Sequence, residues 1–290
     1  STFIDYRNIV QNHLIPAFGD LKLSELTRTH VKDWAAEKDA SRKRIANMLS
    51  PLRQMLADAV DAEKIPKNPL HGWTYKKKDP IKVRDDVDPF TLEEQKAIIA
   101  NLPNQAANLI QFAFWTGLRT SELIALEWGD IDSVRGVVWI RRAKVRGELK
   151  PPKTEAGIRE VKLLPAAAAA LKAQKTHTFL TGQEVFHNPR TGAPWEGDGA
   201  IRKTAWVYAL RKAGVRYRRP YQTRHTYASM MLTAGENPVW VATQMGHRDW
   251  SMIIRVYGRW IPEADPNAGS KAAALWHSLD ASPSGEHSTG

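Results

Sequence analysis

One charged segment interrupted by proline constrains the fold of this chain more than any other part. Residues 73–89, WTYKKKDPIKVRDDVDP, combine a run of lysines, a cluster of aspartates and two prolines. Such a stretch supplies no core and is typical of a linker. It separates two regions with different apolar patterns, and 290 residues are enough for two cores. We therefore expect a first domain over residues 1–72, a linker over 73–89, a second domain over 90–262 and a tail over 263–290.

The first region shows helical periodicity throughout. Its longest apolar stripe, on one helical face, comprises Ile45, Met48, Leu49, Leu52, Met55, Leu56 and Val60. Ser41 can cap this helix, and either Ser24 or Thr27 can cap the helix before it. We expect a domain made only of helices.

The second region mixes helices with short strands. Thr91 and Glu94 in TLEE form a capping box, and a helix, a turn and a helix follow through AANLIQFAFWTGLRTSELIALEW. The segments GVVWIRR and GIREVKLL alternate β-branched and polar residues, which predicts two strands. The remainder, through 200–214, 224–234, 238–246 and 250–258, has helical patterns. The predicted fold class is mainly α with a small antiparallel β-sheet in the second domain.

The positive charge of the chain points to an acidic polymer as partner. The net charge is +11, and residues 199–235 carry eight lysines and arginines with no acidic residue. No apolar run is long enough to span a membrane, and the charge is spread over several elements, so a nucleic acid is favoured over a lipid surface. The basic linker could equally be a solvated surface. The candidate phosphate contacts are Lys76, Lys77, Lys78, Arg141, Arg142, Lys144, Arg218 and Arg219.

Several classes of chemistry are excluded by the residues present. There is no cysteine, no P-loop pattern and no HExxH, and the histidines lack metal-ligand spacing, so we expect neither a metal nor a cofactor. Phosphoryl transfer without a metal needs fixed cations, a protein nucleophile and a proton donor. Arginine suits the first task, since its planar fork binds two phosphate oxygens. Arg119 in TGLRTSEL and Arg224 in YQTRHTYAS stand at turn-to-helix junctions.

Five segments in order resemble the motifs of the tyrosine recombinases, the phage integrase family. They are TGLRTSEL, KPPKTEAGIREV, YQTRHTYAS, MGHRDW and RVYGRW, within residues 90–262. The helical first domain is similar to the SAM-like core-binding domain of that family by pattern and position. The resemblance implies a site-specific DNA recombinase or integrase of a phage or mobile genetic element. Many members carry an arm-site-binding domain before the core-binding domain, so we expect this chain to be part of a longer protein.

The resemblance implies a role for each matching residue. Tyr257 attacks the scissile phosphate and forms a 3′-phosphotyrosine intermediate. Arg119 and Arg224 clamp the phosphate oxygens, His247 hydrogen-bonds to the phosphate, and Lys153 protonates the leaving 5′-oxygen. Strand exchange then proceeds through a Holliday junction without metal or ATP.

Four further residues are given supporting roles, and two of them mark departures from the family pattern. Glu122 orients the first arginine or supports the fold, and His225 acts as a structural or capping histidine. Tyr221 stands where the family commonly has a histidine; its hydroxyl can donate a hydrogen bond but supplies no cation. His247 and Tyr257 are ten residues apart rather than nine, so the loop before the last helix must absorb one residue, with Trp250 packing there as a plug.

Two other functions remain open from the sequence, a catalytically silent DNA-binding protein on the same fold and a type IB topoisomerase. For a recombinase, we expect four protomers on two DNA sites, a tail around residues 272–279 that docks on a neighbour, and an accessory DNA-bending protein. The expected location is the bacterial cytoplasm, at the nucleoid.

Overall fold

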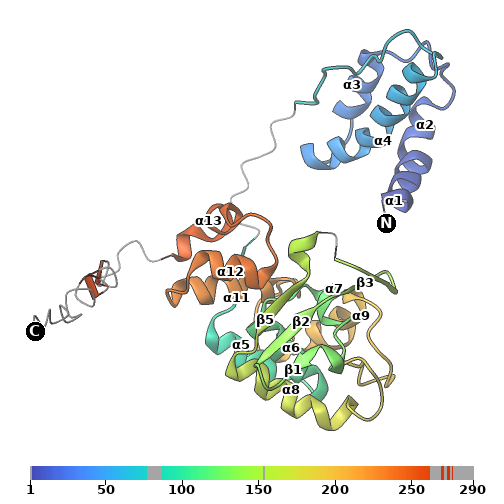
Figure 1. The fold of residues 1–290 in the computed structure, drawn as a ribbon. Coiled ribbons are helices and arrows are strands. Elements are labelled where there is room, and N and C mark those ends of the chain that lie inside the picture. Colours follow the sequence, from blue (N-terminus) through green and yellow to red (C-terminus); the bar gives the residue numbers. More distant parts are fainter. Residues whose placement is uncertain are drawn as a thin grey trace, which may run out of the picture. The chain divides into compact units, whose positions relative to one another are not determined.

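The structure, a computed structural model, describes residues 2–76, 87–152 and 154–261, together with 269–270, 273–274 and 276 (Figure 1). It divides into two compact units, Ser1–Asp85 and Asp86–Gly290. Lys77, Lys78, Lys153 and most of the expected tail lie outside the described residues. In the part of the chain that is described, no helix has both the length and the apolar character needed to cross a membrane.

The first unit is built only from helices. They are α1 (Thr2–Ile9), the π-helical turn η1 (Val10–Leu14), α2 (Ile15–Phe18), α3 (Arg28–Ala36) and α4 (Arg42–Asp61). The Thr27 hydroxyl caps α3 and the Ser41 hydroxyl caps α4, each accepting a hydrogen bond from a backbone N–H of the first turn. Ile45 and Leu49 of the predicted stripe are buried in the core of this unit, whereas Met55 is exposed.

The second unit opens with helices that lead into a small sheet. The helices are α5 (Leu92–Ala100), α6 (Asn104–Thr116) and α7 (Thr120–Leu123). After the 3₁₀ turn η2 (Trp128–Asp130), strands β1 (Ile131–Asp132), β2 (Val137–Ile140) and β5 (Arg159–Lys162) form an antiparallel sheet in the order β1-β2-β5. Between β2 and β5 the chain forms a separate hairpin of β3 (Ala143–Val145) and β4 (Glu148–Lys150), followed by the 3₁₀ turn η3 (Glu155–Gly157).

The rest of the second unit is helical. It comprises α8 (Pro165–Thr178), α9 (Asp198–Ile201), the π-helical turn η4 (Arg202–Trp206), α10 (Val207–Lys212), α11 (Gln222–Thr233), α12 (Pro238–Met245), α13 (Ser251–Tyr257) and the 3₁₀ turn η5 (Gly258–Trp260). Helices α11, α12 and α13 lie together, coloured orange in Figure 1, around buried Tyr227, Val241 and Ile253. The predicted fold class, mainly α with a small antiparallel sheet, is confirmed.

Candidate active site

A glycine turn places Arg119 at the start of α7. Helix α6 ends at Gly117, whose φ of 63° is left-handed, and a Cβ there would lie 2.4 Å from a ring carbon of Tyr227. Arg119 is then the N-cap residue of α7. Its Nη1 donates to Glu122 Oε1 at 2.7 Å, and its Nη2 donates to the Gly246 carbonyl at 3.4 Å. The half-exposed guanidinium is therefore held from two sides.

Two arginines share the carboxylate of Glu122. Arg159 donates from both terminal nitrogens to Glu122, at 3.2 and 3.0 Å, and the Arg119 backbone N–H donates at 3.0 Å. Burial opposes ionisation of the carboxyl, but the hydrogen bond and charge of Arg159, with the charge of Arg119, lower the pKa of Glu122 to about 2. The single negative charge of Glu122 is therefore shared by the two positive charges of Arg119 and Arg159.

Arg159 is a buried residue of β5 that the sequence did not single out. Its Nε donates to the Gln244 carbonyl at 2.7 Å and its Nη1 to the Gly157 carbonyl at 3.1 Å. Gly246 has φ of 65°, and a Cβ there would lie 2.8 Å from Arg159 Nη1. Arg159 therefore joins α7, β5 and the end of α12. The sequence could have indicated its burial, because Arg159 and the apolar Val161 are two residues apart in β5 and therefore point to the same face of the strand, where Val161 is buried.

Arg224, in the first turn of α11, is buried without a carboxylate partner. It is 1% exposed, and its Nη1 donates to the Gly117 carbonyl at 2.7 Å while its Nη2 donates to the Met245 carbonyl at 2.6 Å. Within the described part of the chain, it forms no ion pair. Burial, followed by the charge of Arg119, lowers the pKa of Arg224. The guanidinium stays charged at neutral pH.

His247 follows the C-cap of α12 and contacts Arg224. Its Nε2 accepts a hydrogen bond from Arg224 Nη2 at 2.9 Å, which leaves the ring proton on Nδ1. Nδ1 is buried and has no hydrogen-bond partner among the described residues. Burial and then the charges of Arg224 and Arg119 lower the pKa of His247 to about 4. The imidazole is therefore neutral at pH 7, because both burial and the neighbouring positive charges disfavour its protonated form.

Tyr257, the last residue of α13, turns its hydroxyl toward His225. The Oη lies 2.7 Å from His225 Nδ1, and the tyrosine is 3% exposed. Burial raises the pKa of Tyr257 well above its ordinary value, and the charge of Arg224 opposes that rise only in part. The ring of Tyr221 meets the His225 ring edge-on at 5.1 Å. His225 and Arg224 are consecutive residues of α11, so this helix places both the partner of Tyr257 and the partner of His247.

A basic pocket of about 820 Å³ opens beside Arg119. Tyr221, which is 45% exposed, is part of its wall. The charged side chains that line it are Arg119, Lys144, Arg146, Arg202, Arg219 and a single acid, Asp198. Arg146 and Arg202 were not among the predicted DNA contacts. No three histidines or carboxylates in the described residues come close enough to hold a metal ion.

Three of the predicted phosphate contacts, Arg141, Arg142 and Arg218, already have carboxylate partners; Arg141 Nη1 lies 3.6 Å from Asp130 Oδ1. Arg218 pairs with Asp88 at 3.2 Å and with Glu94 at 2.8 Å, so its charge is compensated. Arg142 is bonded to the buried Asp130, at 3.1 and 3.3 Å. The ion pairs of Arg218 and Arg142 favour a structural role for these two residues over contact with DNA.

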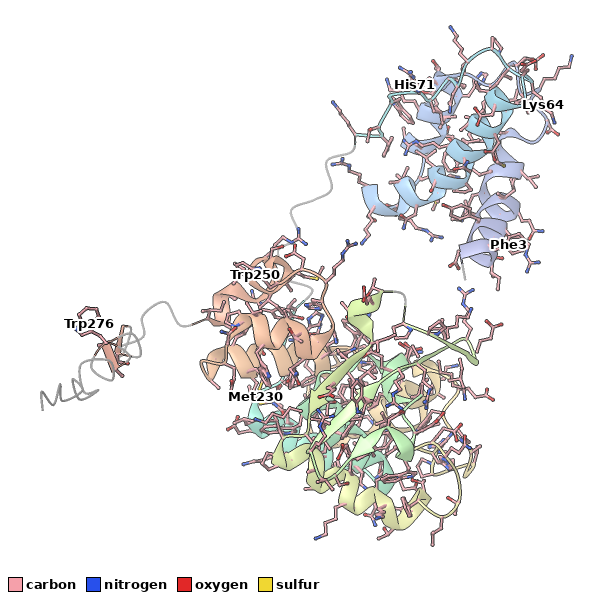
Figure 2. All side chains as sticks on the ribbon, in the orientation of Figure 1. Phe3, Lys64, His71, Met230, Trp250 and Trp276 are labelled. Atoms are coloured by element: carbon pink, nitrogen blue, oxygen red, sulfur yellow. The ribbon has the colours of Figure 1, made fainter. Side chains whose placement is uncertain are left out.

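Other predicted site residues lie at the surface. Arg141 lies over the Trp139 ring, with its guanidinium carbon 5.2 Å from the centroid, and Lys76 is exposed in the first unit. Trp250 is 54% exposed and does not pack as a plug (Figure 2). A turn separates His247 from α13, and in it the Ser251 N–H donates to Asp249 at 2.8 Å.

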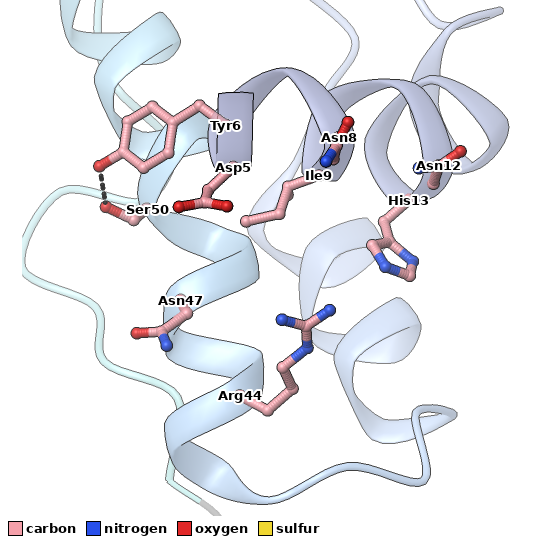
Figure 3. Close-up of a pocket in the computed structure, with 9 residues that line it drawn as sticks. All are labelled: Asp5, Tyr6, Asn8, Ile9, Asn12, His13, Arg44, Asn47 and Ser50. Atoms are coloured by element: carbon pink, nitrogen blue, oxygen red, sulfur yellow. Dashed lines mark hydrogen bonds between the residues drawn. The ribbon is translucent and has the colours of Figure 1, made fainter. Parts of the chain in front are cut away.

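The first unit has a polar pocket of about 590 Å³ between its first helices and α4 (Figure 3). Tyr6 and Ser50 are joined by a hydrogen bond of 2.9 Å at one end of it. The amide side chains of Asn8, Asn12 and Asn47 line the pocket with Arg44, Asp5, His13 and Ile9. No sequence motif marked this pocket, because its residues are single polar positions spread over two helical segments.

Comparisons with known proteins match both units. A sequence model of the phage integrase family matches residues 89–260, and a model of the phage integrase N-terminal SAM-like domain matches residues 1–38. Prophage integrase IntR of Escherichia coli K12 is 33% identical over 253 residues, which are 78% of this chain. The chain spans 60% of the length of that relative.

Two solved structures share the fold. The Tn1549 transposon integrase in complex with transposon right end DNA matches with a TM-score of 0.69 and 20% identity, over 97% of this chain and 94% of that one. A lambda integrase tetramer bound to a Holliday junction matches with a TM-score of 0.67 and 17% identity, over 91% and 73% of the two chains. Since the family model covers more than half of the chain, including Arg119, Arg224, His247 and Tyr257, this chain belongs to the phage integrase family.

Proposed function

We propose that this chain is the core-binding and catalytic part of a site-specific DNA recombinase, an integrase that cuts and rejoins strands through a covalent 3′-phosphotyrosine at Tyr257. The proposal is supported by membership of the phage integrase family and by two contacts made by consecutive residues of α11, His225 with Tyr257 and Arg224 with His247. Tyr257 is the phenol of the segment RVYGRW, and its hydrogen-bond partner His225 is next to Arg224 in the chain.

The observation that carries the proposal is the uncompensated charge around Arg224. Arg119, Arg159 and Arg224 lie in one network, with Glu122 as the carboxylate bound to two of them. Two positive charges therefore remain, one of them almost fully buried, and after burial itself their charge is the next cause that lowers the pKa of His247. A phosphodiester supplies the missing anion, and its non-bridging oxygens match the guanidinium forks.

Each group then has a chemical task. Arg119 and Arg224 hold the non-bridging oxygens and stabilise the charge that develops on them, and His247 adds a hydrogen bond once the phosphate engages Arg224. Lys153 protonates the departing 5′-oxygen; it lies outside the described residues, and this role rests on the family resemblance. Because the phosphotyrosine keeps the bond energy, a second 5′-hydroxyl can reverse the attack, and strands exchange through a Holliday junction without metal or ATP.

The proposed partner is double-stranded DNA, bound by both units. In the second unit the basic pocket beside Arg119 binds phosphates, with Lys144 and Arg219 in its wall. In the first unit the amides of Asn8, Asn12 and Asn47 suit adenine edges and Arg44 suits guanine, so this pocket reads bases.

Assembly and location follow from the same proposal. A solved relative is a tetramer on a Holliday junction, and we propose four protomers for this enzyme as well. An accessory DNA-bending protein and action at the bacterial nucleoid are parts of the same proposal.

The test is a nicked suicide substrate that lets the 5′ end diffuse away. The wild-type chain is expected to accumulate a covalent adduct that survives denaturing electrophoresis, and Tyr257→Phe is expected to form none. DNA binding without an adduct in the wild type would identify a catalytically silent binding protein. Relaxation of plasmids without sequence preference would identify a topoisomerase.

A further inference from the structure

The hydroxyl of Tyr257 makes its hydrogen bond to a residue with no assigned step in the chemistry. His225 Nδ1 lies 2.7 Å from Tyr257 Oη, and the two rings are tilted by 45° with centroids 5.7 Å apart. We propose that His225 is the general base that takes the proton of Tyr257 when the phenol attacks DNA. This inference rests on the proposed function, and it adds a catalytic residue to it.

The phenol needs a base in contact with it. Tyr257 is 3% exposed, so its proton has no direct path to bulk water, and burial raises its pKa. Simple dissociation at neutral pH would leave very little phenolate. A positioned acceptor that removes the proton as the new bond forms avoids this barrier.

His225 is placed for this task by the helix that also places Arg224. Neighbouring residues of an α-helix point about 100° apart. Arg224 therefore faces the carbonyls of Gly117 and Met245, while His225 faces Tyr257. The ring of Tyr221 also packs on the imidazole, with centroids 5.1 Å apart and ring planes at 74°, and this contact restricts the orientation of His225.

His247, the other histidine of the site, is already engaged. Its Nε2 accepts from Arg224, and its Nδ1 carries a proton. Tyr221 occupies the position where the resemblance expects a further histidine, and its side chain has no basic nitrogen to take up a proton. His225 is thus the imidazole that touches the reacting oxygen.

The proposed step balances. A bond forms between Tyr257 Oη and phosphorus, the bond from phosphorus to the 5′-oxygen breaks, and the phenol proton moves to His225 Nδ1. The 5′-oxygen takes a proton from Lys153 in its proposed role. On rejoining, a 5′-hydroxyl attacks phosphorus, its proton returns to the lysine, and His225 returns its proton to Oη. The negative phosphate stabilises the transient imidazolium.

The decisive variant is His225→Asn, whose side-chain oxygen can accept the hydrogen bond from Tyr257 but cannot take up the proton. Single-turnover cleavage of the suicide substrate is expected to slow by about 100-fold. His177→Asn, on α8, is the matched histidine control and is expected to cleave at the wild-type rate. Cleavage by His225→Asn within about threefold of wild type overturns the proposal.

A more acidic phenol separates a proton acceptor from a structural contact. Tyr257 is replaced by 3,5-difluorotyrosine in the wild type and in His225→Asn. The cleavage rate is expected to increase by a factor at least about tenfold larger in His225→Asn than in the wild type, since a more acidic phenol needs a weaker base. An equal effect on both proteins overturns the proposal and leaves His225 a structural residue. A substrate with a 5′-bridging sulfur, which leaves without a proton, is expected to rescue Lys153→Ala but not His225→Asn. Absence of any wild-type adduct would instead reject the recombinase function itself.

Discussion

At the scale of single residues, the site depends on the shape of arginine as much as on its charge. Arg224 donates to two carbonyls and to His247, in three directions from one planar fork. A lysine keeps the charge but cannot reproduce these bonds. Arg224→Lys is expected to reduce the single-turnover cleavage rate by about 10²–10³-fold while DNA affinity changes little. An equal loss of affinity and cleavage would contradict this assignment.

The buried imidazole of His247 makes stability depend on pH. Its pKa is about 4 in the folded chain, against an ordinary value of 6.5. Between these values the unfolded chain binds more protons, so stability present above pH 6.5 is lost as the pH falls toward 4. Allowing for solvent screening, the loss between about pH 7 and about pH 5 is about 1 kcal/mol.

Urea unfolding of wild type and His247→Asn at the two pH values measures this contribution. The wild type is expected to lose more stability than the variant on acidification. The pKa of Glu122 falls from 4.5 to about 2 on folding, so its own contribution is lost mainly between those values, below this window, and equally in both proteins. Equal losses in both proteins would show that His247 titrates normally in the folded chain.

Motifs and chemistry predicted Arg119, Arg224, His247 and Tyr257 as site residues from the sequence alone, because each stands in a segment with a specific pattern. The contact of His225 with Tyr257 was beyond that reasoning. It depends on how α13 packs on α11, and the two residues are 32 positions apart. The hydroxyl of Tyr257 therefore meets the imidazole of His225 only in the folded chain.

At the scale of elements, the pair Arg159–Glu122 joins a strand, a short helix and the end of α12. Removing one partner leaves a buried charge unpaired, so Arg159→Met and Glu122→Gln are each expected to cost about 3–5 kcal/mol of unfolding free energy. The double variant is expected to cost less than the two together by about 1–3 kcal/mol. Urea denaturation of the four proteins gives the coupling.

The exposed pair Arg135–Glu160, joined at 2.8 Å, is the matched control. Its coupling is expected to be much smaller than that of the buried pair, because solvent screens exposed charges. Additive costs for Arg159 and Glu122 would contradict the shared role of their ion pair.

The elements themselves were largely predictable, and the exceptions have local causes. The capping residues Thr27, Ser41 and Thr91 and the glycine at 117 mark helix ends that the structure shows. Arg159 escaped notice because an arginine in an alternating strand normally faces solvent. Burial became favourable only through Glu122, which lies 37 positions away.

At the scale of the whole molecule, the net charge of +11 indicated a nucleic-acid partner, but it did not show which cations are available. Arg142 and Arg218 are paired with carboxylates, while Lys144 and Arg219 line the open pocket beside Arg119. The sequence gives the number of charged residues but not which of them form ion pairs. The fold is needed to separate the predicted contacts that are paired with carboxylates from those that line the pocket.

That division predicts how DNA binding responds to salt. Each phosphate contact removed lowers the slope of log affinity against log salt by about 0.9. Lys144→Ala with Arg219→Ala is therefore expected to reduce the slope by about 2. Lys175→Ala, on α8 and outside the pocket, is the control and should leave it unchanged. Fluorescence anisotropy over a salt series checks this; an unchanged slope in the double variant would place the DNA elsewhere.

The central claim is that the phenol of Tyr257 becomes bonded to DNA. Digesting the trapped adduct with trypsin, after nuclease trimming, should release the peptide of residues 256–259, VYGR, since arginines precede and end it. Mass spectrometry is predicted to find the nucleotide phosphodiester on Tyr257 in that peptide. A nucleotide on any other residue, with this peptide unmodified, would contradict the account.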